Sequence, residues 1–154
     1  MNIRLATKDD YKEVDSLLVA LHMLHVRNNP RMFSPIDYFY TKSEFEERLE
    51  KGINIFYLAE EDEKIVGLIS IHIGQNDYKK IASISSLYVA PQYRNKSIAT
   101  KLMQTAYKYY QENCLGDDFS RYLDLDVCDF NEVAINFYKK MGFSFIAHTM
   151  AIEF

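Results

Sequence analysis

Positive and polar side chains are concentrated in one short turn of the sequence, between residues 90 and 98. A stretch with strand character ends at Ala90-Pro91, and a helical pattern of apolar residues resumes at Ile98. Arg94 and Lys96 therefore lie just before a helix, where backbone N–H groups lack partners within the helix and its dipole favours anions. This arrangement suits a phosphate or diphosphate group. A plain surface turn with two solvated cations is the alternative that this segment alone leaves open.

Carboxylates and imidazoles elsewhere in the chain could contact a cation or move a proton. Asp124 and Asp126 alternate with apolar residues, so they share one face of an expected strand. They could hold a cationic substrate or act on it through a water, or they could simply form a solvated, salt-bridged face. His22 and His25 are three residues apart on an expected helix, but no third ligand accompanies them, and we expect no metal site.

The composition limits the classes of protein that the chain could represent. It has 154 residues, 48% of them hydrophobic and 26% charged, with a net charge of -4. An acidic chain does not favour general nucleic-acid binding, and two cysteines are too few for a disulfide scaffold or a four-cysteine zinc site. No apolar run approaches the ~18 residues of a membrane span. We expect a single cytoplasmic domain over residues 1–154, with no nucleic-acid or membrane partner.

The periodicity of apolar residues predicts the elements that must position these groups. Strands are expected at 3–5, 55–60, 65–73, 81–89, 123–127 and 144–153. Helices are expected at 7–28 and 41–50, from Ile98 onward, and at 134–141. Adjacent strands give antiparallel hairpins, whereas a strand–helix–strand crossover gives a parallel pair. The prediction is an α/β fold with a mixed central sheet and helices on both faces.

Two motifs in this order resemble the GNAT acyltransferase superfamily. Arg94-x-x-Ser97-x-Ala99, preceded by Leu87-x-Val89-x-Pro91, resembles the acyl-CoA signature R/Q-x-x-G-x-G/A. The segment from Asn131 to Phe143 is similar to the family's N-x-x-A-x-x-F-Y-x-x-x-G-F block. The expected element order also matches the family along essentially the whole chain. The resemblance implies the GNAT acyl-CoA acyltransferase fold and an N-acetyltransferase that uses acetyl-CoA and no metal.

The resemblance also implies roles for individual residues. The Val89 N–H would polarise the thioester carbonyl in a gap where strands 81–89 and 122–128 splay apart, and Tyr138 would be the general acid toward the thiolate. Acetyl-CoA would contact Leu87, Tyr88, Val89, Arg94, Asn95, Lys96, Ser97, Ile98, Ala99, Asn131 and Tyr138. The acceptor would lie against His22, His25, Phe33, Asp124 and Asp126. The structural alternative for Asn131 is a helix N-cap. The structural alternative for Tyr138 is a place in the hydrophobic core.

The sequence departs from the family pattern at two places. Ser97 replaces the usual glycine; a serine with negative φ would fit, so we expect weakened or altered CoA binding rather than none. Ser83 and Ser85 stand where many relatives carry a glutamate, so no general base is assigned, and His72 is only a further candidate.

The expected reaction is direct attack in a ternary complex by a small-molecule or peptide primary amine. The alternative function is a non-catalytic acyl-CoA-binding sensor or regulatory module. A homodimer is a further expectation of the resemblance.

Overall fold

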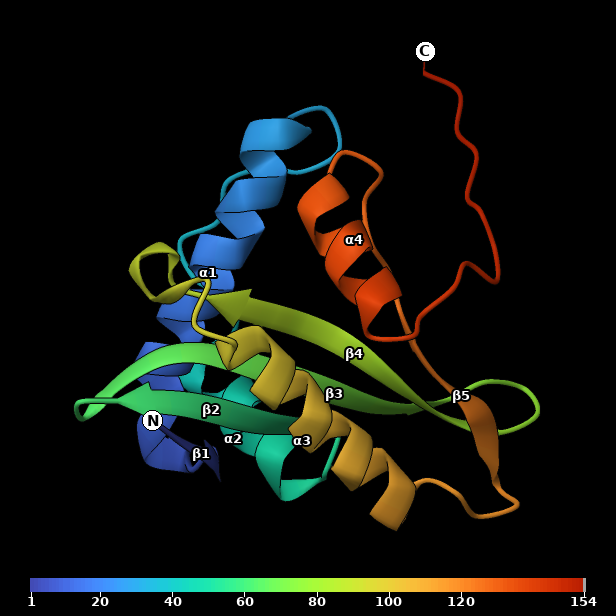
Figure 1. Ribbon diagram of the computed structural model, residues 1–154, viewed down its shortest axis with the longest axis horizontal. Coiled ribbons are helices and arrows are strands. Elements are labelled where there is room, and N and C mark those ends of the chain that lie inside the picture. The colour runs from blue at the N-terminus through green and yellow to red at the C-terminus, as the bar shows by residue number, and fades with distance from the viewer. Residues whose placement is uncertain (154) are drawn as a thin grey trace.

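The strands of the protein form one mixed sheet, seen in the computed structural model, which describes residues 1–153 (Figure 1). The strands are β1 (Asn2–Leu5), β2 (Asn54–Glu61), β3 (Lys64–Gln75), β4 (Lys80–Val89) and β5 (Phe119–Leu125). They lie in the order β1-β2-β3-β4-β5. The first three pairings are antiparallel and the pairing of β4 with β5 is parallel. The predicted mixed sheet is therefore confirmed.

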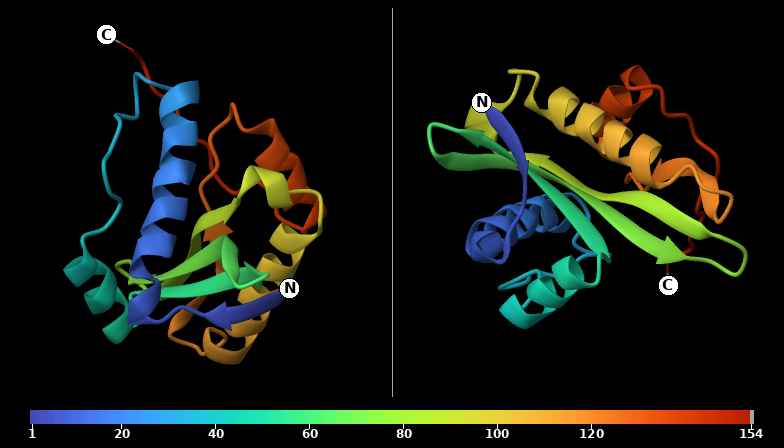
Figure 2. Two further views of the ribbon diagram at one scale, coloured as in Figure 1. Left: turned by 90° about the vertical axis from the view of Figure 1, so that its left-hand side faces the viewer. Right: turned by 90° about the horizontal axis from the view of Figure 1, so that it is seen from below.

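Helices cover both faces of this sheet, as the sequence predicted. The helices are α1 (Tyr11–Asn28), α2 (Lys42–Glu50), α3 (Ile98–Asn113) and α4 (Glu132–Lys140). Short 3₁₀ turns, Lys8–Asp10 and Pro91–Tyr93, precede α1 and α3. Figure 2 shows α1 and α2 on one face and α3 and α4 on the other. Among residues 1–153, no helix combines the length and apolar character needed to cross a bilayer.

Each face of the sheet has its own apolar core. On the α1–α2 face, Val14, Leu18 and Phe45 pack against Phe56 and Leu68. On the α3 face, a second cluster joins α3 to the alternate residues of β3 and β4 through Ile69, Ile71, Ile84, Leu102 and Met103. Because β3 is buried from both sides, its middle is an almost continuous apolar run rather than an alternating one.

Local sequence signals fix the helix ends. Thr7 with Asp10, and Thr41 with Glu44, form capping boxes in which each side chain satisfies a backbone N–H of the other. After α4, Gly142 has a φ of 96°. The Gly142 and Phe143 N–H groups donate to the carbonyls of Lys139 and Tyr138 at 3.1 and 3.0 Å, as in a Schellman motif.

The strand expected at residues 144–153 is wrong. The segment runs past α4 and away from the sheet, so no neighbouring strand meets its backbone (Figure 1). Its contacts are made by side chains: Lys139 Nζ lies 5.4 Å from the Phe145 ring centroid, and Arg31 Nη1 lies 2.5 Å from Glu153 Oε2. Alternation of apolar residues gives a strand only where a partner supplies hydrogen bonds.

Candidate active site

β4 and β5 separate part-way along β4. The last residues that they pair are Ile84 and Leu125, whereas β4 continues to Val89. A β-bulge falls at this point, because β3 pairs Ser70 with Ser86 and Ile71 with Ile84, which leaves Ser85 as an extra residue. A bulge bends the strand that carries it. The splaying that the resemblance implied is therefore present, and it begins at Ser85.

Backbone amides of β4 point into the resulting gap. The Ala90 N–H donates to the Val66 carbonyl at 2.9 Å, so Val89 occupies a non-hydrogen-bonded position opposite β3. Instead, the Val89 carbonyl accepts a hydrogen bond of 2.9 Å from Arg94 Nε. Because the N–H and C=O of a strand residue point to the same side, the Val89 N–H faces the gap, and so does that of Leu87 two residues earlier. This edge of β4 can bind an extended molecule that carries amide and carbonyl groups.

The turn before α3 adopts a backbone conformation that is unusual for its residues. Asn95 and Ser97 have φ angles of 62° and 59°, in the left-handed region. A negative φ was the condition under which serine would fit at position 97, and this condition is not met: serine here takes the conformation that glycine normally takes. Its hydroxyl makes no capping hydrogen bond. The first N–H groups of α3 thus remain open to an anion at the end of the gap.

The two cations of this turn have different partners. The Arg94 guanidinium ties the turn to β4 through Val89 and lies 5.6 Å from the ring centroid of Tyr88. Lys96 Nζ lies 3.7 Å from Glu61 Oε2, which is buried and has no hydrogen-bond partner among residues 1–153. Both cations therefore already have a partner: Lys96 pairs with a carboxylate, and the Nε of Arg94 is held by the backbone.

Tyr138 lies on α4 and packs against the same apolar cluster as Leu87 and Val89, and Asn131 is the residue that precedes α4. The Tyr138 ring lies 5.6 Å from Phe137 and 5.8 Å from Phe143 between centroids, and burial raises its pKa to about 12. The phenol therefore stays protonated at physiological pH and can donate a hydrogen bond. The Asn131 side chain accepts a 3.2 Å hydrogen bond from the Ala134 N–H, so its structural role as an N-cap is present.

A set of polar side chains lies on the α1–α2 face of the sheet, opposite α3. Arg48 donates to Asn54 at 2.9 Å, Asn54 donates to Ser70 at 3.1 Å, and the Ser85 hydroxyl donates to Ser70 at 2.9 Å. Asn54 and Ser70 are buried, whereas Ser85 is exposed. This chain of hydrogen bonds holds the bulge in a defined geometry.

The carboxylate of Asp124 lies on β5 beside this bulge. It accepts a hydrogen bond from the Ser83 hydroxyl of β4, and Ser83 and Asp124 are paired in the parallel register. Asp126 lies in a different environment from Asp124. β5 ends at Leu125, earlier than expected, and Asp126 is exposed in the segment that follows. The structure therefore separates the two aspartates that the sequence placed on one strand.

The two histidines and Phe33 come together as an aromatic wall. The His25 ring is stacked on Phe33 with centroids 5.2 Å apart, and Phe130 meets it from the segment before α4 at 6.0 Å. His22 Nε2 lies 2.8 Å from the Ser34 carbonyl oxygen. Burial and the neighbouring His22 lower the pKa of His25, so its imidazole is neutral at physiological pH.

Several residues of this region were not singled out by the sequence analysis. Phe130 and Glu61 join the region through contacts between distant parts of the chain, for which the sequence carries no local signal. The bulge at Ser85, in contrast, does leave a local signal in the sequence. The inward-facing residues are Ala82 and Ile84 before it, but Leu87 and Val89 after it, so the alternation slips by one residue.

Comparison with known proteins identifies related sequences. The model of the acetyltransferase (GNAT) family matches residues 18–143. An N-alpha-acetyltransferase of Sulfurisphaera tokodaii is 34% identical over 107 residues, which are 64% of this chain and 62% of that protein. An uncharacterized N-acetyltransferase of Methanocaldococcus jannaschii is 27% identical over 149 residues, which are 92% of this chain and 59% of that protein. The chain spans about three fifths of the length of these curated relatives.

Solved structures have the same architecture. A tetramutant of the BH1408 protein from Bacillus halodurans is 27% identical with a TM-score of 0.87, and the match covers 100% of both chains. A ribosomal-protein-alanine N-acetyltransferase from Brucella melitensis has a TM-score of 0.68 at 18% identity, again over 100% of both chains. The second likeness is one of fold alone.

Proposed function

Since the chain belongs to the GNAT family of acetyltransferases, we propose that it transfers the acetyl group of acetyl-CoA to a primary amine. The observation that carries this proposal is the open edge of β4. The amides of Leu87 and Val89 point into a gap that ends at the N-terminus of α3. An extended arm with amide groups and a diphosphate at one end matches that arrangement.

The donor would lie along β4 with its diphosphate at the turn before α3. The open N–H groups of Ile98 and Ala99, the exposed ammonium of Lys96 and the Ser97 hydroxyl would bind the phosphates. The pantetheine arm would take the place of a sheet neighbour and pair with Leu87 and Val89. Tyr88 and Asn95 would flank this path, and Asn131 would contact the donor from the start of α4. Acetyl-CoA supplies the activated acetyl thioester.

Two groups of this chain would act on the reacting atoms. The amine nitrogen attacks the carbonyl carbon and forms the C–N bond, while the Val89 N–H stabilises the negative charge on the oxygen. The C–S bond then breaks, the Tyr138 hydroxyl donates a hydrogen bond to the departing thiolate, and the proton released by the attacking nitrogen passes to solvent water. Because the pKa of Tyr138 is about 12 and that of an ordinary thiol is about 8.5, this donation is a stabilising hydrogen bond rather than complete proton transfer.

The acceptor would approach from the α1–α2 side of the sheet. Asp124, fixed by Ser83, offers a carboxylate to an ammonium group, and the wall of His22, His25 and Phe33 bounds the same side. Direct attack fits better than an acyl-cysteine step, because burial raises the pKa of the Cys114 and Cys128 thiols. The resemblance of an N-alpha-acetyltransferase to this chain makes the α-amine of a peptide one acceptor to be tested.

The experiment combines calorimetry with a thiol-release assay. We expect acetyl-CoA to bind, and free CoA to form with at least one member of a panel of small primary amines and peptides with free N-termini. Binding without turnover on any amine would support the alternative of an acyl-CoA sensor. An absence of binding heat together with an absence of turnover would overturn both functions.

The role of Asp124 is tested with its neighbour as the matched control. Asp124→Asn should raise the KM for the amine about 10-fold or more, since a charge-assisted contact contributes ~1.5–3 kcal/mol, and it should leave acetyl-CoA affinity unchanged. Asp126→Asn removes the same charge from an exposed position and should have a much smaller effect. Equal effects of the two substitutions would show that only the overall charge matters.

A further inference from the structure

Two polar side chains, Asn54 of β2 and Ser70 of β3, are buried at a place where the sheet is otherwise apolar. They are 2% and 1% exposed, and Ser70 is paired with Phe56 of the apolar cluster on the α1–α2 face. Burial of a polar group costs free energy unless the group is hydrogen-bonded, and replacing both partners of such a bond by apolar groups of the same shape is nearly neutral. The stability of the core therefore does not require Asn54 and Ser70, which indicates another role.

The two residues form a closed set of hydrogen bonds with Arg48 and Ser85. Asn54 Oδ1 accepts from Arg48, and Asn54 Nδ2 donates to Ser70 Oγ at 3.1 Å and to Ser85 Oγ at 3.4 Å. The Ser85 hydroxyl lies 2.9 Å from Ser70 Oγ and 3.3 Å from the Ser70 carbonyl oxygen. Within residues 1–153, none of these four residues has a buried side-chain nitrogen or oxygen without a partner. A fully satisfied network of this kind favours one arrangement of its members.

Ser85 is the residue on which this network acts. As the extra residue of the bulge it has no partner residue on β3, so its side chain supplies the connection that the backbone ladder lacks. β4 leaves its parallel neighbour directly after Ile84. The position of Ser85 therefore sets the direction in which Leu87 and Val89 point their N–H groups.

The outer end of the network is held by the helices of the α1–α2 face. The guanidinium carbon of Arg48 lies 4.7 Å from the centroid of the Tyr40 ring. Tyr40 is in turn fixed to α1, because its N–H donates to Asp15 at 2.9 Å and its carbonyl accepts from the Tyr11 hydroxyl at 2.9 Å. Asn54 is thus anchored through α2 and α1, and a group supported by rigid elements keeps its geometry better than one on a loop.

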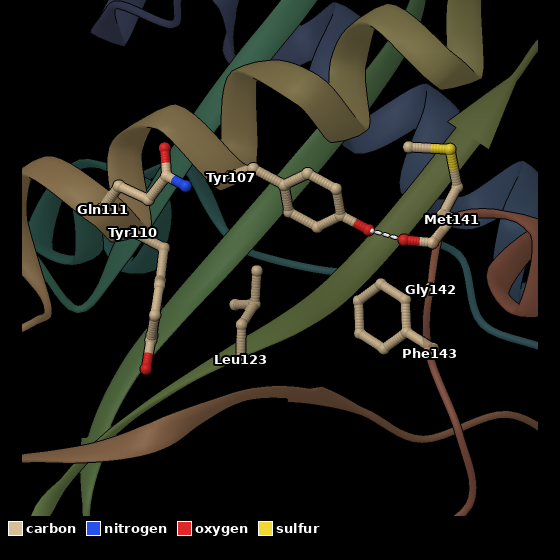
Figure 3. A pocket seen from close by; sticks show the side chains of 7 residues that line it. All are labelled: Tyr107, Tyr110, Gln111, Leu123, Met141, Gly142 and Phe143. Atoms are coloured by element: carbon tan, nitrogen blue, oxygen red, sulfur yellow. Dashed lines mark hydrogen bonds between the residues drawn. The ribbon is translucent and has the colours of Figure 1, made fainter.

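On the α3 face, the sheet is held by apolar packing. Tyr107, Tyr110 and Leu123 line a hollow of about 280 Å³ there, between α3, β5 and the end of α4 (Figure 3). The hydrogen bond drawn in this hollow, from the Tyr107 hydroxyl to the Met141 carbonyl at 2.7 Å, joins α3 to the end of α4 and does not reach β4. The side chains that hydrogen-bond to the bulge therefore come from the α1–α2 face.

We infer that Asn54 and Ser70 are positioning residues of the proposed acetyltransferase: they fix Ser85, and through it they aim the Leu87 and Val89 N–H groups at the arm of acetyl-CoA. The inference rests on the proposed function and adds to it two residues that lie on β2 and β3 rather than in the gap. Both are buried and reach the gap only through Ser85. Loss of either hydrogen-bonding group should therefore disturb the gap while the apolar core stays in place.

Ser70→Thr and Ser70→Val form a matched pair for the test, because the two new side chains have nearly the same shape and only threonine keeps the hydroxyl. In the ligand-free proteins, we expect Ser70→Val to shift the amide NMR signals of Leu87 and Val89 relative to Ser70→Thr. In calorimetry, the Kd of acetyl-CoA should be about 10-fold higher for Ser70→Val, since displaced amides no longer pair with the arm. A role in stability alone would change the melting temperature and leave the amide signals and the Kd equal within the pair, which would overturn the inference.

Asn54→Leu and Asn54→Asp repeat the comparison at a second position, which decides the question if a substitution at Ser70 prevents folding. Leucine removes the hydrogen bonds, whereas aspartate can accept from Arg48 and from serine hydroxyls. Only Asn54→Leu should therefore shift the two amide signals and weaken binding. A shift of the signals without any change in Kd would also overturn the inference. If even the native protein gives no binding heat, the proposed function and this role fail together, whereas a failure of this inference alone leaves native binding intact.

Discussion

Tyr138 is a phenol whose surroundings favour its neutral form. Phe137 and Phe143 shield the ring, and burial raises its pKa to about 12. A donor of this kind keeps its proton throughout the pH range in which an amine can act as a nucleophile. Its contribution to a reaction can therefore be separated from the binding of the substrate.

Tyr138→Phe keeps the packing of the ring and removes only the hydroxyl. We expect kcat to fall on the order of 10²-fold, as for the loss of a positioned acid, because the thiolate loses its hydrogen-bond donor. The Kd of acetyl-CoA, measured by calorimetry, should change less than threefold. An unchanged kcat would place Tyr138 in the core only.

Ser97 carries a backbone cost that a glycine would not. A left-handed conformation costs an L-residue about 1–2 kcal/mol, part of which glycine loses again through its greater freedom in the unfolded chain. We expect Ser97→Gly to raise the free energy of unfolding by about 0.5–1 kcal/mol in urea titrations. Ser97→Ala keeps the strain and should not stabilise the protein. If both variants weaken acetyl-CoA binding equally, the hydroxyl itself contacts a phosphate.

At the scale of elements, Asp10 joins β1 to the start of α1. Its carboxylate accepts hydrogen bonds of 2.7 and 2.8 Å from Arg4 and one of 2.7 Å from the Thr7 N–H. The bonds from Arg4, followed by those from Thr7, lower its pKa to about 2 despite partial burial. The depressed pKa means that the ionised form stabilises the fold at neutral pH.

Asp10→Asn keeps a cap acceptor and removes the charge. At pH 7 we expect the free energy of unfolding to fall by about 1–2 kcal/mol, in the range for a cap or a charged hydrogen bond. Because the pKa is lower in the folded state, this stabilisation is present above pH 4 and is lost as the pH falls toward 2. The difference between native and variant proteins should therefore shrink as the pH falls from 4 to 2 and vanish only below pH 2. Asp9→Asn, at an exposed neighbour, is the control, and an equal loss there would contradict the assignment.

The sequence predicted the individual helices and strands better than the contacts between distant parts of the chain. Capping residues such as Thr7 and Thr41, and the glycine at 142, are local signals, so the ranges expected for the helices lie within a few residues of those observed. The strand at 144–153 failed because pairing depends on a distant edge. Likewise the φ of Ser97 depends on how the turn is held between β4 and α3. The family resemblance indicated His25 and Phe33 as acceptor residues, but not that Phe130 would contact His25.

At the scale of the whole molecule, the proposed donor site spans both sides of the gap. β4 and the start of α3 form one side, and the start of α4 forms the other. In the free protein they are joined by the parallel pairing of β4 with β5 and by packing of α4 and Phe143 against the α3 cluster. A ligand that contacts both sides should therefore stabilise the molecule as a unit.

Thermal unfolding with and without ligand tests whether acetyl-CoA stabilises the whole molecule. At 100 times its Kd, acetyl-CoA should add about 2.7 kcal/mol, which for a chain of this size raises Tm by roughly 5–10 °C. S-acetylpantetheine lacks the nucleotide and diphosphate, so it should produce a much smaller rise at the same concentration. Equal shifts would mean that the turn before α3 is not where the phosphates bind.

The separation of β4 from β5 coincides with one extra residue of β4. The last rung that the two strands share is at Ile84, and the extra residue of β4, Ser85, comes directly after it. Without Ser85, Ile84, Leu87 and Val89 would follow one another in strict alternation. The strand would then continue straight beside its parallel neighbour, and an ordinary ladder would occupy the amides at 87 and 89. Deletion of Ser85 should therefore close the gap and abolish the proposed binding of acetyl-CoA, while the apolar core stays intact.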